Sequence, residues 1–237
     1  MANQRGFFIS FESIDGLGKT TQVKKLVQSL TDLGYNVLET KEPGDRNAGS
    51  NIGAGIRNLV FKDPTTLKMK PGVADLLFLA DHIQTAGDIE DAVAAGKIAI
   101  SDRYADSQWA YNASDTKKCP EWVMDLFESH FGIVPDLTIL LVARGKLQSI
   151  AESEDISWAL SRGKARQGDE AGKQNGKAWN NVEDQRRIQR AYLNRMSPMG
   201  RTFRIDVWED SSIKEIAQSI LSVVMSNLTF SSEQEAA

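Results

Sequence analysis

A strand-turn-helix segment near the N-terminus carries the residue types that bind nucleotide phosphates. An apolar strand is expected over 6–11, a glycine-bearing turn follows, and Gly-Lys-Thr-Thr opens an amphipathic helix over 20–33. Backbone N–H groups of such a turn, together with the helix N-terminus, direct partial positive charge at phosphate oxygens. The lysine can reach the β- and γ-phosphates, and the first threonine hydroxyl can ligate Mg²⁺. The predicted nucleotide-binding residues of this turn are Asp15, Gly16, Leu17, Gly18, Lys19, Thr20 and Thr21.

An ordinary strand-to-helix turn is the alternative interpretation of this segment. It does not account for a lysine at the start of a helix, where the helix dipole disfavours a cation. The usual pattern is G-x-x-x-x-G-K-[ST], and Ser13 occupies the position of its first glycine. If that position requires a positive φ, we expect mild backbone strain at Ser13.

Charged residues suited to a second phosphate follow the later strands. Asp102 comes directly after an apolar strand expected over 98–101, where an acid can hold Mg²⁺ or its waters. The next residue, Arg103, offers a planar fork for a phosphate, although an Asp-Arg pair can also be a surface ion pair. A kinase needs a second anion pocket facing the first, whereas a hydrolysing switch needs one nucleotide. The residues that would supply such a pocket are Glu42, Pro43, Gly44, Arg57 and Arg103.

Composition limits the class of protein and its surroundings. The 237 residues, 41% hydrophobic and 25% charged, suffice for a single domain over 1–237 with a sizeable core. The net charge of −4 argues against long nucleic acid as a partner, so an anion site must be a local cluster of Arg and Lys. The single cysteine favours a reducing compartment, and two histidines argue against a zinc site. We expect no signal peptide, no membrane contact and a cytoplasmic location.

Apolar strands alternate with amphipathic helices along the chain. Strands are expected over 6–11, 35–42, 98–101, 137–142 and 203–207, and helices over 20–33, 52–61, 71–95, 120–131, 146–160, 182–196 and 212–228. The alternation predicts an α/β fold of three layers, with a parallel five-stranded sheet flanked by helices and ligands at the carboxyl ends of the strands. The polar segment 161–181 is either a mobile surface loop or a lid that closes on phosphates with Arg162, Lys164 and Arg166. A tail over 229–237 is expected to be disordered.

Taken together, these motifs resemble the thymidylate (dTMP) kinase family. The segment 11–22, F-E-S-I-D-G-L-G-K-T-T-Q, is similar to that family's phosphate loop, and Glu-Pro-Gly at 42–44 matches its turn. The segments 55–57 and 77–81 look like its Ile-Arg element and its helix over the base. The pattern D-R-Y-x-x-S-x-x-A-Y over 102–111 is its most specific signature, and 135–138 fits the strand that follows. The resemblance covers about 6–224 in the right order and implies the P-loop kinase fold.

The resemblance implies ATP-dependent phosphorylation of dTMP to dTDP for dTTP synthesis, with ATP and Mg²⁺ bound. Gly16, Gly18, Lys19 and Thr20 would hold the ATP phosphates, and Thr20 and Asp102 would hold the metal ion. Because Gly16 rather than arginine follows Asp15, the chain is similar to the subgroup whose catalytic arginine comes from the lid. The catalytic candidates are therefore Lys19, Asp15, Arg103, Arg162 and Arg166.

The family's acceptor side also has matching positions in this chain. The resemblance implies that Arg57 and Arg103 bind the acceptor phosphate and that Asp15 lies near the sugar 3′-hydroxyl. Phe78 would stack on the pyrimidine, because an aromatic face suits a flat base. Tyr111 would exclude a ribose 2′-hydroxyl. The predicted substrate-binding residues are Asp15, Glu42, Pro43, Arg57, Phe78, His82, Arg103, Ser107, Gln108 and Tyr111.

Some positions depart from the family pattern and keep alternatives open. His82 stands where the family has an arginine, and a neutral imidazole would alter base preference or weaken dTMP binding. The segment 168–181 is longer than the usual lid, so dUMP or a 5-modified dUMP is an alternative acceptor. A nucleotide-binding regulatory ATPase or a binding-only homologue is less favoured, because the Asp-Arg-Tyr signature supplies a second phosphate site. The family usually forms homodimers, and helices over 75–95 and around 109–131 are the candidate contacts.

Overall fold

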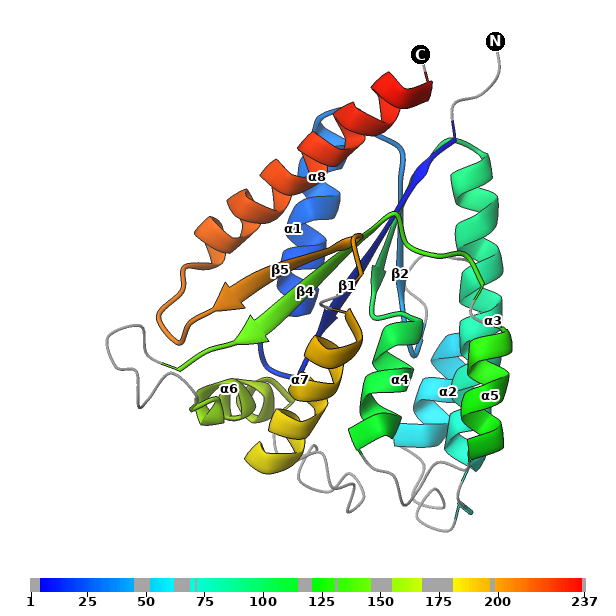
Figure 1. Cartoon of the computed structure of the whole chain (residues 1–237), viewed down its shortest axis with the longest axis vertical. Helices are drawn as coiled ribbons and strands as arrows, with labels where there is room; N and C mark the ends of the chain where they lie inside the picture. The colour runs from blue at the N-terminus through cyan, green and yellow to red at the C-terminus, as the bar shows by residue number, and fades with distance from the viewer. Residues whose placement is uncertain are drawn as a thin grey trace.

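A parallel sheet of five strands forms the centre of the molecule. The computed structural model describes residues 5–44, 52–61, 69–70, 72–114, 121–130, 132–145, 155–167, 181–196 and 199–235. The strands lie in the order β2-β3-β1-β4-β5 (Figure 1), and all four neighbouring pairs are parallel. Their bounds are β1 Phe7–Ser13, β2 Val37–Lys41, β3 Ile98–Asp102, β4 Leu137–Ala143 and β5 Thr202–Val207. The expected α/β fold with a five-stranded parallel sheet is confirmed.

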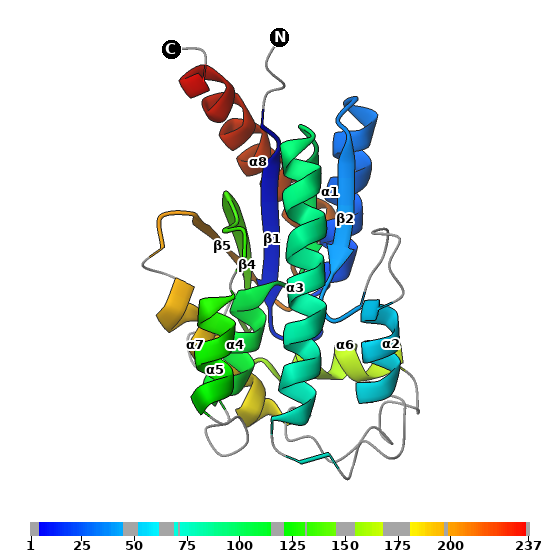
Figure 2. The same ribbon diagram turned by 90° about the vertical axis from the view of Figure 1, so that its right-hand side faces the viewer.

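Helices cover both faces of this sheet (Figures 1 and 2). Helices α1 and α8 pack against each other on one face, and α3 covers the other. Within the described ranges, no helix has both the length and the apolar character needed to cross a membrane. The helices are α1 Lys19–Asp32, α2 Ile52–Phe61, α3 Val73–Ala94, α4 Ala105–Ser114, α5 Glu121–Ser129, α6 Ser157–Gln167, α7 Val182–Met196 and α8 Ile213–Glu235.

The central strand β1 shows how the sequence divides the two faces. Every residue of β1 is buried, and successive side chains point to opposite faces of a sheet. Ile9 and Phe11 join the core with α1 and α8, whereas Phe8 packs with α3 residues on the other face. The same alternation places Glu12 on the α3 face, at the carboxyl end of the sheet, where its carboxyl group enters the functional site.

Three helical regions differ from the expectation. Helix α4, Ala105–Ser114, was not in the expected set, and α5 spans Glu121–Ser129 within the expected 120–131; residues 115–120 lie outside the described ranges. Helix α6 begins at Ser157, whose N–H donates to Asp155 Oδ1 at 2.9 Å as in a capped N-terminus. It continues to Gln167, so residues 161–167 are helical. Residues 146–154 and 168–180 lie outside the described ranges. Helix α8 continues past 228 to Glu235, and Thr229 Oγ1 donates to the carbonyl of Met225, four residues earlier, at 3.0 Å.

Candidate active site

The turn between β1 and α1 has the backbone of a phosphate-binding loop. Gly16 and Gly18 have φ values of 85° and 79°, a conformation that side chains disfavour. At Gly16 the requirement is also steric, because an added Cβ would lie 1.7 Å from the carbonyl oxygen of Ala159 in α6. Ser13 lies buried at the end of β1 without a positive φ, and its Oγ donates to Ile14 O at 2.7 Å. The strain considered for Ser13 is therefore not present.

Charged and hydroxyl side chains from three elements meet beside this loop. Asp102, at the end of β3, is fully buried and accepts hydrogen bonds from Lys19 Nζ and, at 2.5 Å, from Thr20 Oγ1. Lys41, at the end of β2, places its Nζ 3.6 Å from the same carboxylate. Burial alone would raise the pKa of Asp102, but the two lysine charges hold that pKa well below its usual range. An ionised carboxylate beside a hydroxyl is a donor set that suits Mg²⁺, so these residues fit the metal ion.

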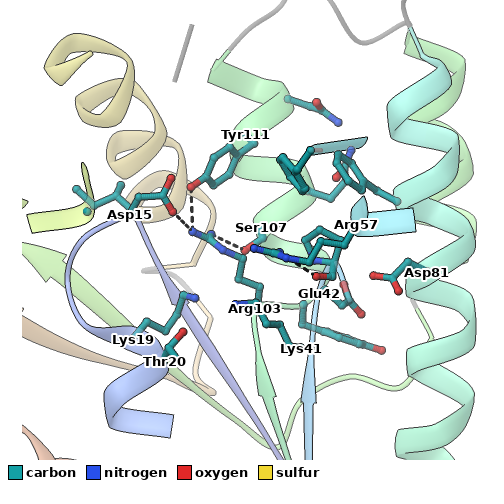
Figure 3. Close-up of a pocket in the computed structure, with 18 of the residues that line it drawn as sticks. Asp15, Lys19, Thr20, Lys41, Glu42, Arg57, Asp81, Arg103, Ser107 and Tyr111 are labelled. Atoms are coloured by element: carbon teal, nitrogen blue, oxygen red, sulfur yellow. Dashed lines mark hydrogen bonds and ion pairs between the residues drawn. The ribbon is translucent and has the colours of Figure 1, made fainter. Parts of the chain in front are cut away.

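Arg103 follows β3 in a left-handed conformation with φ 79°, alone among the described non-glycine residues. Such a conformation costs about 1–3 kcal/mol and persists where the surroundings fix it. Here the Arg103 N–H donates to Phe11 O at 3.0 Å, and Ser101 Oγ donates to Arg103 O at 2.5 Å. The guanidinium then reaches the phosphate loop, where Nη2 donates to Asp15 Oδ1 at 2.6 Å and to Tyr111 OH at 3.0 Å (Figure 3).

Behind Arg103 lies a buried hydrogen-bond network around Glu12. Glu12 Oε1 accepts from the Tyr104 N–H at 2.8 Å. Its Oε2 lies 2.5 Å from Ser107 Oγ and 3.1 Å from Tyr192 OH, and these two hydroxyl oxygens are 2.7 Å apart. If each of these three oxygen–oxygen contacts is a hydrogen bond, each needs one proton, and the hydroxyls of Ser107 and Tyr192 supply only two. A protonated Glu12 would supply the third.

The electrostatics of Glu12 agree with this proton count. Its burial and the nearby charge of Asp106 raise the pKa of Glu12 to about 8. The groups that act in the opposite direction are Ser107, through its hydrogen bond, and the cations Arg103 and Lys19. The raised pKa favours the neutral form of Glu12, and the hydroxyl oxygens of Ser107 and Tyr192 also accept hydrogen bonds from Arg103 Nη1.

The opposite wall is built by α2, α3 and the turn after β2. Arg57 Nη1 donates to Pro43 O at 3.1 Å, and its guanidinium lies 5.3 Å from the ring centroid of Phe61. The Gly44 N–H donates to Asp81 Oδ2 at 3.1 Å, which fastens the turn to α3. A second arginine fork is thereby held across from Arg103, as Figure 3 shows.

Aromatic rings and an oriented amide form the far end of the site. The rings of Phe61 and Phe78 stack with centroids 6.0 Å apart and an interplanar angle of 27°. Gln108 Nε2 donates to Asp75 Oδ1 at 3.0 Å. A carboxylate can only accept, so Asp75 fixes which end of the amide is the carbonyl oxygen. An aromatic surface beside an oriented amide suits a flat, polar-edged ring.

All of these parts surround one cavity of about 440 Å³. A second cavity of about 410 Å³ lies on the other side of the phosphate loop, lined by Thr21, Gln22 and Arg162 among others. Arg162 Nη2 donates to Glu209 O at 2.7 Å there, while the side chain of Arg166 lies outside the described residues. The sequence-predicted residues that line the first cavity are Asp15, Gly16, Leu17, Gly18, Lys19, Thr20, Glu42, Pro43, Arg57, Phe78, Arg103, Ser107, Gln108 and Tyr111.

His82 lies behind the cavity wall rather than in the cavity. Its side chain is 1% exposed, and Nδ1 lies 3.0 Å from Glu42 Oε1. Its ring centroid is 4.7 Å from that of Tyr104 and 6.0 Å from that of Phe127, and all three of these neighbours line the cavity. Any influence of His82 on a ligand must therefore pass through these neighbours.

Several site residues were missed by sequence reasoning. Glu12 had a visible signal, since a carboxylate inside an otherwise apolar strand needs a special partner. Tyr192 follows Gln185 and Gln189 at helical spacing, so a polar stripe along 182–196 was also visible. The other missed residues carry no sequence signal that we recognise: Lys41, Phe61 and Asp75.

Comparison with known proteins identifies the family. The family model described as thymidylate kinase matches residues 11–220. The chain is 45% identical over 138 residues to the thymidylate kinase of Maridesulfovibrio salexigens, covering 56% of this chain and 60% of that protein. It is 32% identical over 227 residues to the thymidylate kinase of Ruegeria pomeroyi, covering 94% and 96%. Four such relatives, that of M. salexigens among them, are matched over 58% to 66% of their own length.

A solved structure gives the same result for the fold. The chain superposes on thymidylate kinase from Candida albicans with a TM-score of 0.65 at 20% identity, covering 94% of this chain and 92% of that one. At this identity the likeness concerns the fold alone. The family model, in contrast, covers most of the chain with the phosphate loop and the Arg103 signature inside it. The chain belongs to the thymidylate kinase family.

Proposed function

We propose that this protein transfers the γ-phosphoryl group of ATP to dTMP, giving dTDP and ADP. The observation that carries the proposal is a single cavity with a phosphate loop at one side, two arginine forks across it, and stacked aromatic rings at its end. A switch or an ATPase without an acceptor has no use for the second anion pocket and the aromatic end.

The donor side of the reaction rests on the phosphate loop. The loop N–H groups and Lys19 would bind the β- and γ-phosphates, with Lys19 leaving its present partner Asp102. Thr20 and Asp102 would hold Mg²⁺, whose charge would neutralise the developing negative charge on the phosphate oxygens. Lys41 remains beside Asp102 when Lys19 turns to the phosphates, so the buried carboxylate keeps a cationic neighbour.

The acceptor phosphate would bind between Arg103 and Arg57. Arg103 Nη2 contacts Asp15, whose side chain is 46% exposed, so a phosphate oxygen can take over this position. One oxygen of that phosphate forms the new bond to the γ-phosphorus while the bond from that phosphorus to the leaving ADP oxygen breaks. Such a transfer depends on positioning and on charge neutralisation. Arg162 and Arg166 are our candidates for the additional transition-state cation.

The nucleoside would occupy the aromatic end. Phe78 would stack on the base, and the carbonyl oxygen of Gln108, oriented by Asp75, would accept from the N3–H of thymine. The Tyr111 hydroxyl, held by Arg103 at 3.0 Å, would stand beside the sugar and disfavour a ribose. This arrangement predicts a 2′-deoxynucleotide with a protonated N3 as the acceptor.

A coupled ADP-release assay with ATP and Mg²⁺ tests the proposal. The panel is dTMP, dUMP, 5-hydroxymethyl-dUMP, dCMP, dGMP and UMP, with acceptor-free enzyme as the blank. We expect the highest kcat/KM for dTMP. If none of the six gives turnover above the acceptor-free blank, the kinase assignment is wrong and a nucleotide-binding protein remains.

Phosphorylation of dUMP or a 5-modified dUMP is a second candidate, favoured by His82. Its imidazole is bound to Glu42, so α3 presents no cation to the base at this position. The variant His82→Arg should then change the ratio of kcat/KM for dTMP over dUMP. An unchanged ratio and an unchanged KM for dTMP would remove His82 from base selection.

We further infer a homodimer that pairs α3 with its counterpart. Val73, Leu76 and Ile83 lie at helical spacing with 39%, 39% and 49% of their surface exposed. Ala80 between them is also exposed, so an apolar stripe runs along the outer side of α3, which faces the viewer in Figure 2. Light scattering after gel filtration should give twice the chain mass for the parent and the single mass for Ile83→Glu. A monomeric parent at micromolar concentration would contradict the inference.

A further inference from the structure

The two ends of the Arg103 fork have different surroundings. Nη2 contacts Asp15 and Tyr111, both of which line the cavity. Nη1 points inward and donates to Ser13 O at 3.0 Å, to Ser107 Oγ at 3.1 Å and to Tyr192 OH at 3.2 Å. The inward nitrogen therefore anchors the side chain, while the outward nitrogen can exchange its partner for a phosphate oxygen.

Tyr192 is the anchor that comes from the most distant element. Its ring is 1% exposed within the main hydrophobic core, so the position of its hydroxyl is set by packing. The hydroxyl contacts Glu12, Ser107 and Arg103 together. Tyr192 does not line the cavity, and so it can act on a ligand only through neighbours that do. These are Arg103 and Ser107, through its hydroxyl, and Tyr111, whose ring lies edge-on to the Tyr192 ring with centroids 6.5 Å apart, a contact that phenylalanine would keep.

One face of α7 fastens several parts of the site at once. Gln185 Oε1 accepts from the Asp15 N–H at 3.2 Å. Gln189 bonds to both the N–H and the carbonyl of Ala143 at the end of β4, at 2.7 and 3.2 Å. With Tyr192, these residues occupy positions i, i+4 and i+7 of the helix. The helix that carries Tyr192 is thus held in register with both the phosphate loop and the sheet.

We propose that Tyr192 is a positioning residue that fixes the Arg103 fork in the orientation that binds the acceptor phosphate. The inference rests on the proposed function, since it assumes that Arg103 contacts that phosphate. Without the hydroxyl, Nη1 keeps Ser13 and Ser107 as partners but loses one of its three acceptors, and Ser107 Oγ keeps Glu12 but loses its contact with Tyr192. The fork then samples other orientations, and the phosphate loses a preorganised partner.

The test compares dTMP with thymidine, which has the same base and sugar but no phosphate. Dissociation constants for dTMP, thymidine and ATP are measured by calorimetric titration for the parent and for Tyr192→Phe, which keeps the buried ring. Tyr35→Phe, at an exposed position away from the cavity, is the matched control. We expect Tyr192→Phe to weaken dTMP binding roughly tenfold, as for one hydrogen bond to a charged group, and to leave thymidine and ATP unchanged.

Two results with Tyr192→Phe would overturn the inference while leaving the proposed function in place. Parental affinity for dTMP in Tyr192→Phe would show that the hydroxyl does not position Arg103. Equal weakening of dTMP and thymidine would show a general structural role, and a urea unfolding curve measured on the same sample would then report the accompanying loss of stability. A parent that binds dTMP no more tightly than thymidine would instead contradict the proposed function, and the inference with it.

Discussion

Replacing Glu12 by glutamine tests whether this buried carboxyl is protonated in the folded protein. Glutamine has the shape of a protonated glutamate. Its carbonyl oxygen can accept from the Tyr104 N–H, and its NH₂ group can face the hydroxyl oxygens of Ser107 and Tyr192. If Glu12 is neutral, the substitution keeps the same neighbours, with the amide nitrogen donating to hydroxyl oxygens where Oε2 of the carboxyl group accepts.

The expected effect on stability follows from the raised pKa of Glu12. The folded pKa of about 8 exceeds the ordinary 4.5, so between these values the folded protein keeps a proton that the unfolded chain has lost. The free energy of unfolding therefore falls as the pH rises through this window, by roughly 1.4 kcal/mol per pH unit and roughly 3 kcal/mol by pH 7. Glu12→Gln removes this dependence, so the variant should equal the parent near pH 5 and exceed its stability at pH 7 and 8.

Urea unfolding at pH 5, 7 and 8 measures the difference in the free energy of unfolding between Glu12→Gln and the parent. The titration of all other groups largely cancels in this difference. Glu215→Gln, at an exposed position on α8, is the control and should give a small, nearly constant difference. If Glu12→Gln is less stable than the parent at pH 8, an ionised Glu12 supports Arg103 and the proton count is wrong. A difference that does not vary with pH would refute the raised pKa.

The other substitutions act at or beside the two cavities. Asp75→Asn frees the Gln108 amide to flip, and we expect the ratio of kcat/KM for dTMP over dCMP to fall about tenfold; a parental ratio would remove Asp75 from base recognition. Asp102→Asn should raise the Mg²⁺ concentration for half-maximal activity and lower kcat roughly 100-fold, and a magnesium titration with a parental midpoint would contradict the metal assignment. Arg162→Ala should lower kcat by about 10³-fold in steady-state assays with little change in the KM for dTMP; a smaller loss would leave Arg166 as the candidate.

The phosphate loop and the charged residues at the end of β3 were predictable because their sequence signals are local. Gly18 and Lys19 adjoin one another in sequence, and Asp102 and Arg103 follow an apolar run directly. Parallel strands then bring these segments to one edge of the sheet without further information. Gly18, Lys19 and Arg103 line one cavity, Asp102 contacts Lys19 without lining it, and the binding roles of these residues stay predictions.

The network behind Arg103 was not predictable in the same way. Glu12 and Tyr192 are 180 positions apart, and their contact depends on how α7 packs against α4 at the end of the sheet. The φ of 79° at Arg103 is likewise imposed by tertiary contacts, since arginine has no preference for that conformation. His82 shows the limit of resemblance, because a position that suggested direct ligand contact is occupied by a side chain turned toward Glu42.

The close approach of α6 to the phosphate loop makes two catalytic designs mutually exclusive. A Cβ at position 16 would lie only 1.7 Å from the carbonyl oxygen of Ala159. The loop therefore cannot carry an arginine at this position while α6 stays where it is. If Arg162 or Arg166 supplies the transition-state cation, as we propose, moving that cation to position 16 would also require α6 to move away from the loop. An arginine in the loop and the present position of α6 therefore exclude each other.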